Sequence, residues 1–190
     1  AFDHQLQRFV AIKEYMPASL ASRGDGESVV VRSERHQDTF EAGRRSFITE
    51  ARMLAQFKHP ALVEVFRFWE QNGTVYMAMP YYRGKTLREV LKNGAQIDER
   101  WIKSVLGPVM DALEMMHAQN VYHRDIAPDN VLILTTGAPV LLDLGAARRI
   151  ISDLTQAVTV VLKPGYAPIE QYAEDTSIRQ GPWTDIYALA

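Results

Sequence analysis

The alternation of apolar and polar residues near the start of the chain predicts a β-strand. In residues 8–15, RFVAIKEY, Val10 and Ile12 fall on the same face of an extended segment. Residues 17–39 are rich in Ser, Gly, Arg and Asp, a composition that predicts an exposed excursion. From residue 39 to residue 57, apolar positions recur at three- and four-residue steps, which is the spacing of an amphipathic helix.

Two hairpins are predicted further along the chain. Aromatic and β-branched residues dominate residues 62–70 and 74–81, which are therefore expected to be strands. The segment between them contains Asn-Gly, the strongest short signal for a tight hairpin turn. A second, short and buried hairpin is expected from residues 131–134 and 139–144.

After residue 81 the pattern becomes helical. Asp98 is a suitable N-cap for a long helix, and Pro108 inside that helix is expected to kink it. The apolar residues expected on its buried side are Trp101, Ile102, Val105, Val109, Leu113 and Met116. Another helix is expected at residues 183–190. A strand-rich half followed by a helical half predicts an α+β fold with a cleft, a common position for a ligand site.

Composition restricts the classes of function. The 190 residues suffice for one ordinary domain or two small lobes, and 47% hydrophobic with 23% charged residues is typical of a globular protein. A net charge of −2 gives no electrostatic reason to expect nucleic acid or an anionic membrane as a partner. The chain has no cysteine and no apolar run of about 18 residues. We therefore expect a cytoplasmic location and no membrane segment in this chain, and leave open a membrane tether outside it.

Polar residues suited to phosphoryl transfer occur in a characteristic order. Lys13 ends the string VAIK, Glu50 lies in the predicted helix, and Asp125 ends a His-Arg-Asp triplet. Asn130 follows Asp125 by five positions and Asp143 follows it by eighteen. Each residue alone has an ordinary alternative, such as an edge-strand lysine, a solvated helix glutamate or a polar turn. Their order and spacing together match the protein-kinase signature set.

On these motifs, and on GYAPIEQY near the end, the chain resembles the protein kinase family, specifically its bacterial eukaryotic-like Ser/Thr branch. The resemblance implies a two-lobed protein-kinase-like fold with a β-rich N-lobe (1–79), a hinge (80–83) and a helical C-lobe (84–190). It also implies a domain truncated at both ends, because no G-x-G-x-x-G precedes Lys13. ATP, Mg²⁺ and protein substrates are the expected ligands, without nucleic acid.

The resemblance also implies roles for the motif residues. Lys13 is expected to bind the α- and β-phosphates, with Glu50 holding it as an ion pair. Asn130 and Asp143 are expected to hold the magnesium ions, which prefer oxygen ligands. Asp125 is expected to accept or orient the hydroxyl of the substrate.

The adenine site implied by the resemblance lies around the string MAMPYY. Met79 is expected to be the gatekeeper, and Pro80 to begin the hinge. The missing N–H of Pro80 is compatible with ATP, because this first hinge residue contributes its carbonyl group. Tyr82 would contribute the N–H, and Ala11 and Leu132 would sandwich the base.

The chain departs from the family pattern near Asp125. Ser/Thr kinases usually have a lysine two residues after the catalytic Asp, where this chain has Ala127. They also usually have a threonine at the position of Lys163. We hypothesise that Lys163 supplies the charge that Ala127 lacks. For regulation, Arg124 is expected to neutralise a phosphate on the activation segment, with Thr159 favoured among the sites of phosphorylation.

The sequence therefore predicts a protein kinase that transfers the γ-phosphate of ATP to Ser/Thr hydroxyls, with weak or no activity in this fragment alone. Two alternatives stay open. One is a pseudokinase that binds nucleotide or acts as a scaffold, and the other is a small-molecule phosphotransferase of related fold.

Overall fold

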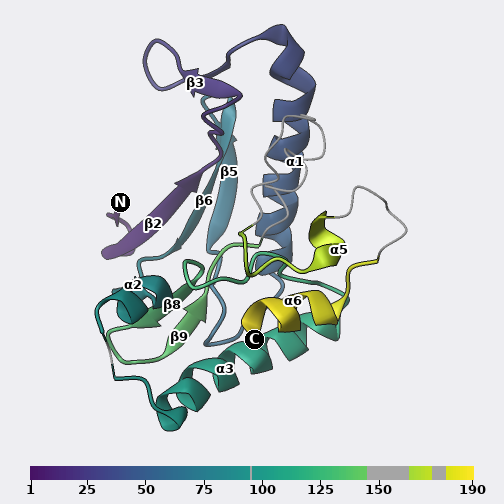
Figure 1. Cartoon of the computed structure of the whole chain (residues 1–190). Coiled ribbons are helices and arrows are strands. Elements are labelled where there is room, and N and C mark those ends of the chain that lie inside the picture. Colours follow the sequence, from purple (N-terminus) through teal and green to yellow (C-terminus); the bar gives the residue numbers. More distant parts are fainter. Residues whose placement is uncertain (95, 145–162, 173–178) are drawn as a thin grey trace. The chain divides into compact units, whose positions relative to one another are not determined.

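The structure of the protein is a computed structural model that describes residues 1–94, 96–144, 163–172 and 179–190 (Figure 1). The described residues form two compact units. The first contains residues 1–56 and 64–81, and the second contains residues 57–63 together with the described residues from 82 onward. The break between Tyr81 and Tyr82 falls inside the predicted hinge, whereas the limits of the two lobes stay a prediction.

The first unit contains a four-stranded antiparallel sheet in the order β1-β2-β6-β5. Its strands are β1 (Phe2–Asp3), β2 (Arg8–Glu14), β5 (Arg67–Gln71) and β6 (Thr74–Pro80). The Asn-Gly hairpin turn is confirmed, with φ of 53° at Asn72 and 74° at Gly73. The strand predicted at 62–70 begins only at Arg67. The strand predicted near the start of the chain is confirmed as β2, on which Val10 is buried and Ile12 is 45% exposed.

Helix α1 (Gln37–Leu54) packs beside strands β5 and β6, as Figure 1 shows. Its buried apolar stripe comprises Phe40, Phe47, Ala51 and Leu54, and the predicted helix is confirmed to within three residues at each end. Tyr15, at the end of β2, packs its ring against Phe40 and Phe47 and donates a hydrogen bond to the carbonyl oxygen of Phe40 at 3.1 Å. The core of the first unit thus lies between the helix and the sheet.

Most of residues 17–39 are exposed, as predicted for this segment, but it also forms secondary structure and buries part of its length. This segment contains strands β3 (Ala21–Arg23) and β4 (Val29–Val31), followed by the 3₁₀ helix η1 (Glu34–His36). The side chains of Leu20, Ala21 and Val29 are buried in the core of the first unit. Strands of three residues are too short to produce a periodic pattern, so the polar composition concealed them.

The second unit is built on helix α3 (Glu99–His117), which continues through Pro108. Asp98 is its N-cap as predicted, and its side chain accepts a hydrogen bond from the N–H of Trp101 at 2.7 Å. The buried residues of this helix are Val105, Val109, Ala112, Leu113 and Met116. Ile102, predicted to be buried, is 41% exposed.

A three-stranded sheet in the order β7-β8-β9 accompanies α3. Its strands are β7 (Gly84–Thr86), β8 (Val131–Leu134) and β9 (Pro139–Leu141), so the second predicted hairpin is confirmed. Helix α2 (Leu87–Lys92) begins with a capping box of Thr86 and Glu89 and was not predicted, because six residues carry little periodicity. Helices α5 (Ile169–Tyr172) and α6 (Pro182–Leu189) complete the unit.

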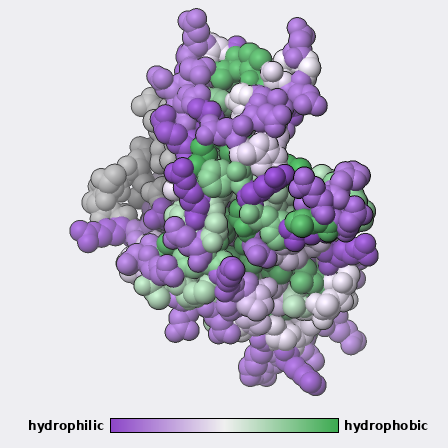
Figure 2. Space-filling view, turned by 180° about the vertical axis from the view of Figure 1, so that it is seen from behind, coloured by the Kyte–Doolittle hydropathy of each residue, from purple (hydrophilic) through white to green (hydrophobic). Residues whose placement is uncertain are grey.

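Sheets and helices together confirm the predicted α+β class. Hydrophilic residues cover much of the face shown in Figure 2. None of the helices in the described part of the chain combines the length and the apolar character that a membrane crossing requires.

Candidate active site

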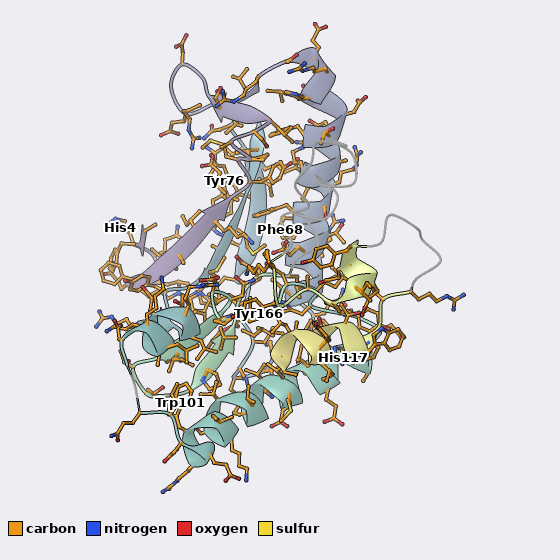
Figure 3. The ribbon with its side chains drawn as sticks, in the orientation of Figure 1. His4, Phe68, Tyr76, Trp101, His117 and Tyr166 are labelled. Atoms are coloured by element: carbon orange, nitrogen blue, oxygen red, sulfur yellow. The ribbon has the colours of Figure 1, made fainter. Side chains whose placement is uncertain are left out.

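The backbone of the His-Arg-Asp triplet is held by a single buried carboxylate from α6. Asp185, which is fully buried, accepts a hydrogen bond from the N–H of His123 at 2.8 Å and another from the N–H of Arg124 at 2.7 Å. His117, labelled in Figure 3, is the last residue of α3. Its Nε2 atom lies 2.8 Å from the same carboxylate. Arg124 has a φ of 64°, in the left-handed region that non-glycine residues rarely adopt. Asp185 therefore stabilises a backbone conformation that Arg124 does not favour by itself.

The side chain of Asp125 is oriented by Asn130. The Nδ2 group of Asn130 donates to the carboxylate Oδ2 of Asp125 at 2.7 Å and to its main-chain oxygen at 2.6 Å. Asn130 is buried, and its own N–H donates to the carbonyl oxygen of Ala127 at 2.8 Å, which closes the turn between the two residues. The five-residue spacing in the sequence is thus the spacing of one hydrogen-bonded turn, and it positions the carboxylate of Asp125.

The two departures from the family pattern lie close to Asp125 in the second unit. The Nζ atom of Lys163 lies 3.4 Å from Oδ1 of Asp125, as an ion pair. Ala127 is buried, with 2% of its surface exposed. The structure therefore brings a cation from a distant segment to the predicted catalytic carboxylate.

The ring of His123 connects the loop to the strand that precedes Asp143. Its Nε2 atom lies 2.8 Å from the carbonyl oxygen of Leu142, and the N–H of Asp125 donates to its Nδ1 atom at 3.3 Å. These partners assign the neutral ring, with the proton on Nε2. Burial lowers the pKa of His123, although the carboxylate of Asp185 acts in the opposite direction. The imidazole is therefore a neutral structural link.

The two predicted magnesium ligands are connected through the main chain. The N–H of Leu142, which precedes Asp143, donates to the carbonyl oxygen of Asn130 at 2.7 Å. Asp143 has a φ of 42°, again in the left-handed region. Within the described ranges, no group of three or more His, Cys, Asp and Glu residues could hold a metal ion. One amide and one carboxylate nevertheless fit Mg²⁺, which usually takes its other oxygen ligands from phosphates and water.

In the first unit, Lys13 and Glu50 form the predicted ion pair. Lys13 Nζ lies 3.0 Å from Glu50 Oε1, although the two residues are 37 positions apart in the sequence. Glu50 is almost completely buried on the inner face of α1, whereas the side chain of Lys13 is 31% exposed. A buried carboxylate is costly unless a cation accompanies it, so Lys13 offsets part of the cost of burying Glu50. Lys13 is thereby held in one orientation, with part of its surface accessible.

The register of β2 and β6 brings together three of the predicted adenine-binding residues. Ala11 lies directly opposite Met79, and the neighbouring pair joins Val10 with Pro80. Leu132 is on β8 in the second unit, where it pairs with Thr86 and Val140, and Tyr82 belongs to that unit too. A common adenine site of all five residues therefore stays a prediction.

Of the two predicted regulatory residues, Thr159 lies outside the described residues. The guanidinium group of Arg124 lies 5.7 Å from the centre of the Tyr122 ring. The carbonyl oxygen of Arg124 accepts a hydrogen bond from the side chain of Gln171 in α5 at 2.8 Å. Sequence reasoning missed Gln171 and His117, since no local spacing relates either residue to the catalytic loop.

The profile of the family described as protein kinase domain matches residues 18–190. The chain belongs to the protein kinase domain family. It is 31% identical over 196 residues to the serine/threonine-protein kinase PknA of Mycobacterium tuberculosis, which covers the whole of this chain and 40% of PknA. It is 30% identical over 168 residues to cyclin-dependent kinase-like 4 of Mus musculus, covering 88% of this chain and 48% of that kinase.

Among solved structures, the chain is similar to the apo form of PpkA-294. The TM-score is 0.90 and the sequence identity is 52%, over 99% of this chain and 66% of that one. These values confirm the predicted kinase fold. The chain spans less than half the length of the curated relatives named above. Members of this family generally use ATP and Mg²⁺ and phosphorylate proteins.

Proposed function

We propose that this protein is a Ser/Thr protein kinase that transfers the γ-phosphoryl group of ATP to hydroxyl groups of protein substrates. The observation that carries the proposal is the geometry of Asp125, whose carboxylate is oriented by Asn130 on a backbone that Asp185 supports. A pseudokinase would not require this carboxylate to be held in one orientation. Relatives described as serine/threonine-protein kinases support the same function.

In the proposed reaction, Asp125 accepts the proton of the attacking hydroxyl group. The hydroxyl oxygen forms a bond to the γ-phosphorus, and the bond from that phosphorus to the β,γ-bridging oxygen breaks. The electron pair of the broken bond leaves with ADP. Phosphoryl transfer depends mainly on positioning and on neutralising charge, so the carboxylate has to orient the nucleophile as much as deprotonate it.

Each unit contains residues suited to one part of the nucleotide–metal complex. Lys13, held by Glu50, would bind the α- and β-phosphates. Asn130 and Asp143 would hold Mg²⁺, which when bound neutralises charge on the phosphate oxygens. The adenine would contact the residues predicted for the adenine site at and near the hinge. A cysteine-free composition is consistent with a reducing compartment such as the cytoplasm, where ATP is abundant.

The test is transfer of radiolabelled phosphate from ATP to a generic basic protein in the presence of Mg²⁺. Asp125→Asn keeps the hydrogen bond from Asn130 possible but removes the base, and should lower transfer by about 10²-fold or more. Asp111→Asn, an exposed carboxylate on α3, is the matched control and should not change it. Analysis of the labelled residues identifies Ser and Thr as acceptors.

Three other outcomes would contradict the proposal. Nucleotide binding without any transfer that depends on Asp125 would identify a pseudokinase. Label found only on a small molecule would identify a small-molecule phosphotransferase. Label on tyrosine would exclude the Ser/Thr class.

A further inference from the structure

The ammonium group of Lys163 is incompletely satisfied. The ammonium nitrogen is buried, and within the described residues it forms an ion pair with Asp125 at 3.4 Å. Among the described residues, it makes no hydrogen bond. A buried cation costs free energy unless it is both paired and hydrogen-bonded. An ammonium has three N–H donors, so Lys163 retains the capacity to bind a further anion.

The position of Lys163 relative to Asp125 indicates which anion this would be. Asn130 donates to Oδ2 of the Asp125 carboxylate, and Lys163 lies beside the other oxygen. A hydroxyl group that gives its proton to Asp125 must lie about 3 Å from the carboxylate. The phosphorus it attacks must lie about 3–3.5 Å from the hydroxyl oxygen. The oxygens of the transferred phosphoryl group are therefore within reach of the Lys163 ammonium.

No charge is available from the position where the family usually has its lysine. Ala127 carries only a methyl group and is 2% exposed. The ammonium of Lys163, 3.4 Å from Oδ1 of Asp125, is therefore a cation beside the part of the loop that Ala127 leaves without one.

We propose that Lys163 is a catalytic residue that donates hydrogen bonds to the γ-phosphoryl oxygens during transfer and rests on Asp125 when no nucleotide is bound. This inference rests on the proposed kinase function. A cation already in place where negative charge accumulates stabilises the transition state without reorganisation. The bonds made and broken are those given above, and Lys163 keeps its own proton throughout. The proton of the acceptor hydroxyl still passes to Asp125.

The experiment compares neutral and charged replacements of Lys163. Lys163→Met and Lys163→Gln remove the charge, and Lys163→Arg retains it. Lys103→Met is the matched control, because Lys103 lies on α3 with 75% of its side chain exposed. For each purified variant, kcat for phosphate transfer and the binding affinities for ATP and ADP are measured, with thermal unfolding as a check of folding.

Both neutral variants should lower kcat by about 10²-fold, while Lys163→Arg keeps most of the activity. They should also weaken ATP binding by about tenfold and leave ADP binding unchanged, because ADP lacks the γ-phosphate. Three results would overturn the proposal: a kcat equal to that of Lys103→Met, an equal loss of ATP and ADP affinity, or a higher kcat. A higher kcat would mean that the ion pair with Lys163 inhibits Asp125.

Failure of this inference can be told apart from failure of the proposed function. If Asp125→Asn abolishes transfer and the neutral Lys163 variants do not lower it, the protein is a kinase and Lys163 is not catalytic. If no transfer depends on Asp125, the kinase proposal fails. In that case the neutral Lys163 variants still show whether Lys163 contacts the γ-phosphate, because they would weaken the binding of ATP more than that of ADP.

Discussion

Replacing Asp185 with Asn should loosen the catalytic loop without changing its shape. Asn has the size of Asp but presents an NH₂ group in place of one carboxylate oxygen, so it can accept from His123 or from Arg124 but not from both. A hydrogen bond to a charged group contributes about 1.5–3 kcal/mol, and the variant loses one of the two. Removing a buried charge returns part of this free energy. We therefore expect a net loss of about 2 kcal/mol.

The loss can be measured as the change in the free energy of unfolding in urea, together with amide hydrogen exchange. The amides of His123 and Arg124 should exchange faster by one to two orders of magnitude, roughly the exchange equivalent of about 2 kcal/mol. Asp111→Asn, on the exposed side of α3, is the control and should change neither quantity. If Asp185→Asn behaved like this control, the two backbone hydrogen bonds would not hold the loop.

Three further predictions follow from individual contacts. Because the pKa of His123 is lowered in the folded protein, the unfolded chain binds more protons below about pH 6.5, so stability should fall between about pH 7.5 and pH 5.5. In urea unfolding, His123→Phe should reduce the change of the free energy of unfolding with pH. The same pH dependence in this variant would contradict the prediction. Glu50→Gln should lower phosphate transfer at least about tenfold, because Lys13 loses the carboxylate that orients it. The free energy of unfolding should change by less than about 1 kcal/mol, because the variant also removes a buried charge. Unchanged transfer would refute this prediction. Gly73→Ala should lower the free energy of unfolding more than Gly137→Ala. Both glycines have positive φ, but a Cβ at Gly73 would also lie 2.8 Å from a main-chain carbonyl oxygen of β4. Equal losses for the two variants would exclude an effect of this close contact.

The parts of the fold predicted correctly are those with long or chemically specific signals. Helix α1 and helix α3 show apolar periodicity over 18 and 19 residues, and the β5–β6 hairpin contains Asn-Gly at its turn. Strands β3 and β4 and helix α2 were missed because three to six residues do not establish a period. Leu20 and Val29 lie in the core of the first unit, and the N–H of Val29 donates to the carbonyl oxygen of Asn72, a contact between distant segments.

The candidate site was predictable wherever residue type and local spacing carry the chemistry. The turn from Asp125 to Asn130 is local, and its hydrogen bonds explain its spacing. The pairing of Lys13 with Glu50 came from the family resemblance, since 37 residues separate them. The contributions of His117 and Gln171 depend on how α3 and α5 pack in the second unit, and nothing in the sequence near these residues signals them.

The strained residues of the second unit explain why its catalytic groups are in position before any ligand binds. Arg124 and Asp143 both have left-handed backbones, which cost non-glycine residues about 1–2 kcal/mol each. Such conformations persist only when neighbouring contacts determine them. Asp185 holds the N–H of Arg124, and Asn130 accepts from the residue before Asp143. The acceptor for Leu142 is the main-chain carbonyl oxygen of Asn130, whereas its side-chain amide orients Asp125, so one residue holds both the backbone before the predicted metal ligand and the side chain of the predicted base. Replacing the Asn130 side chain should therefore release the Asp125 carboxylate but leave the main-chain hydrogen bond that supports the backbone before Asp143.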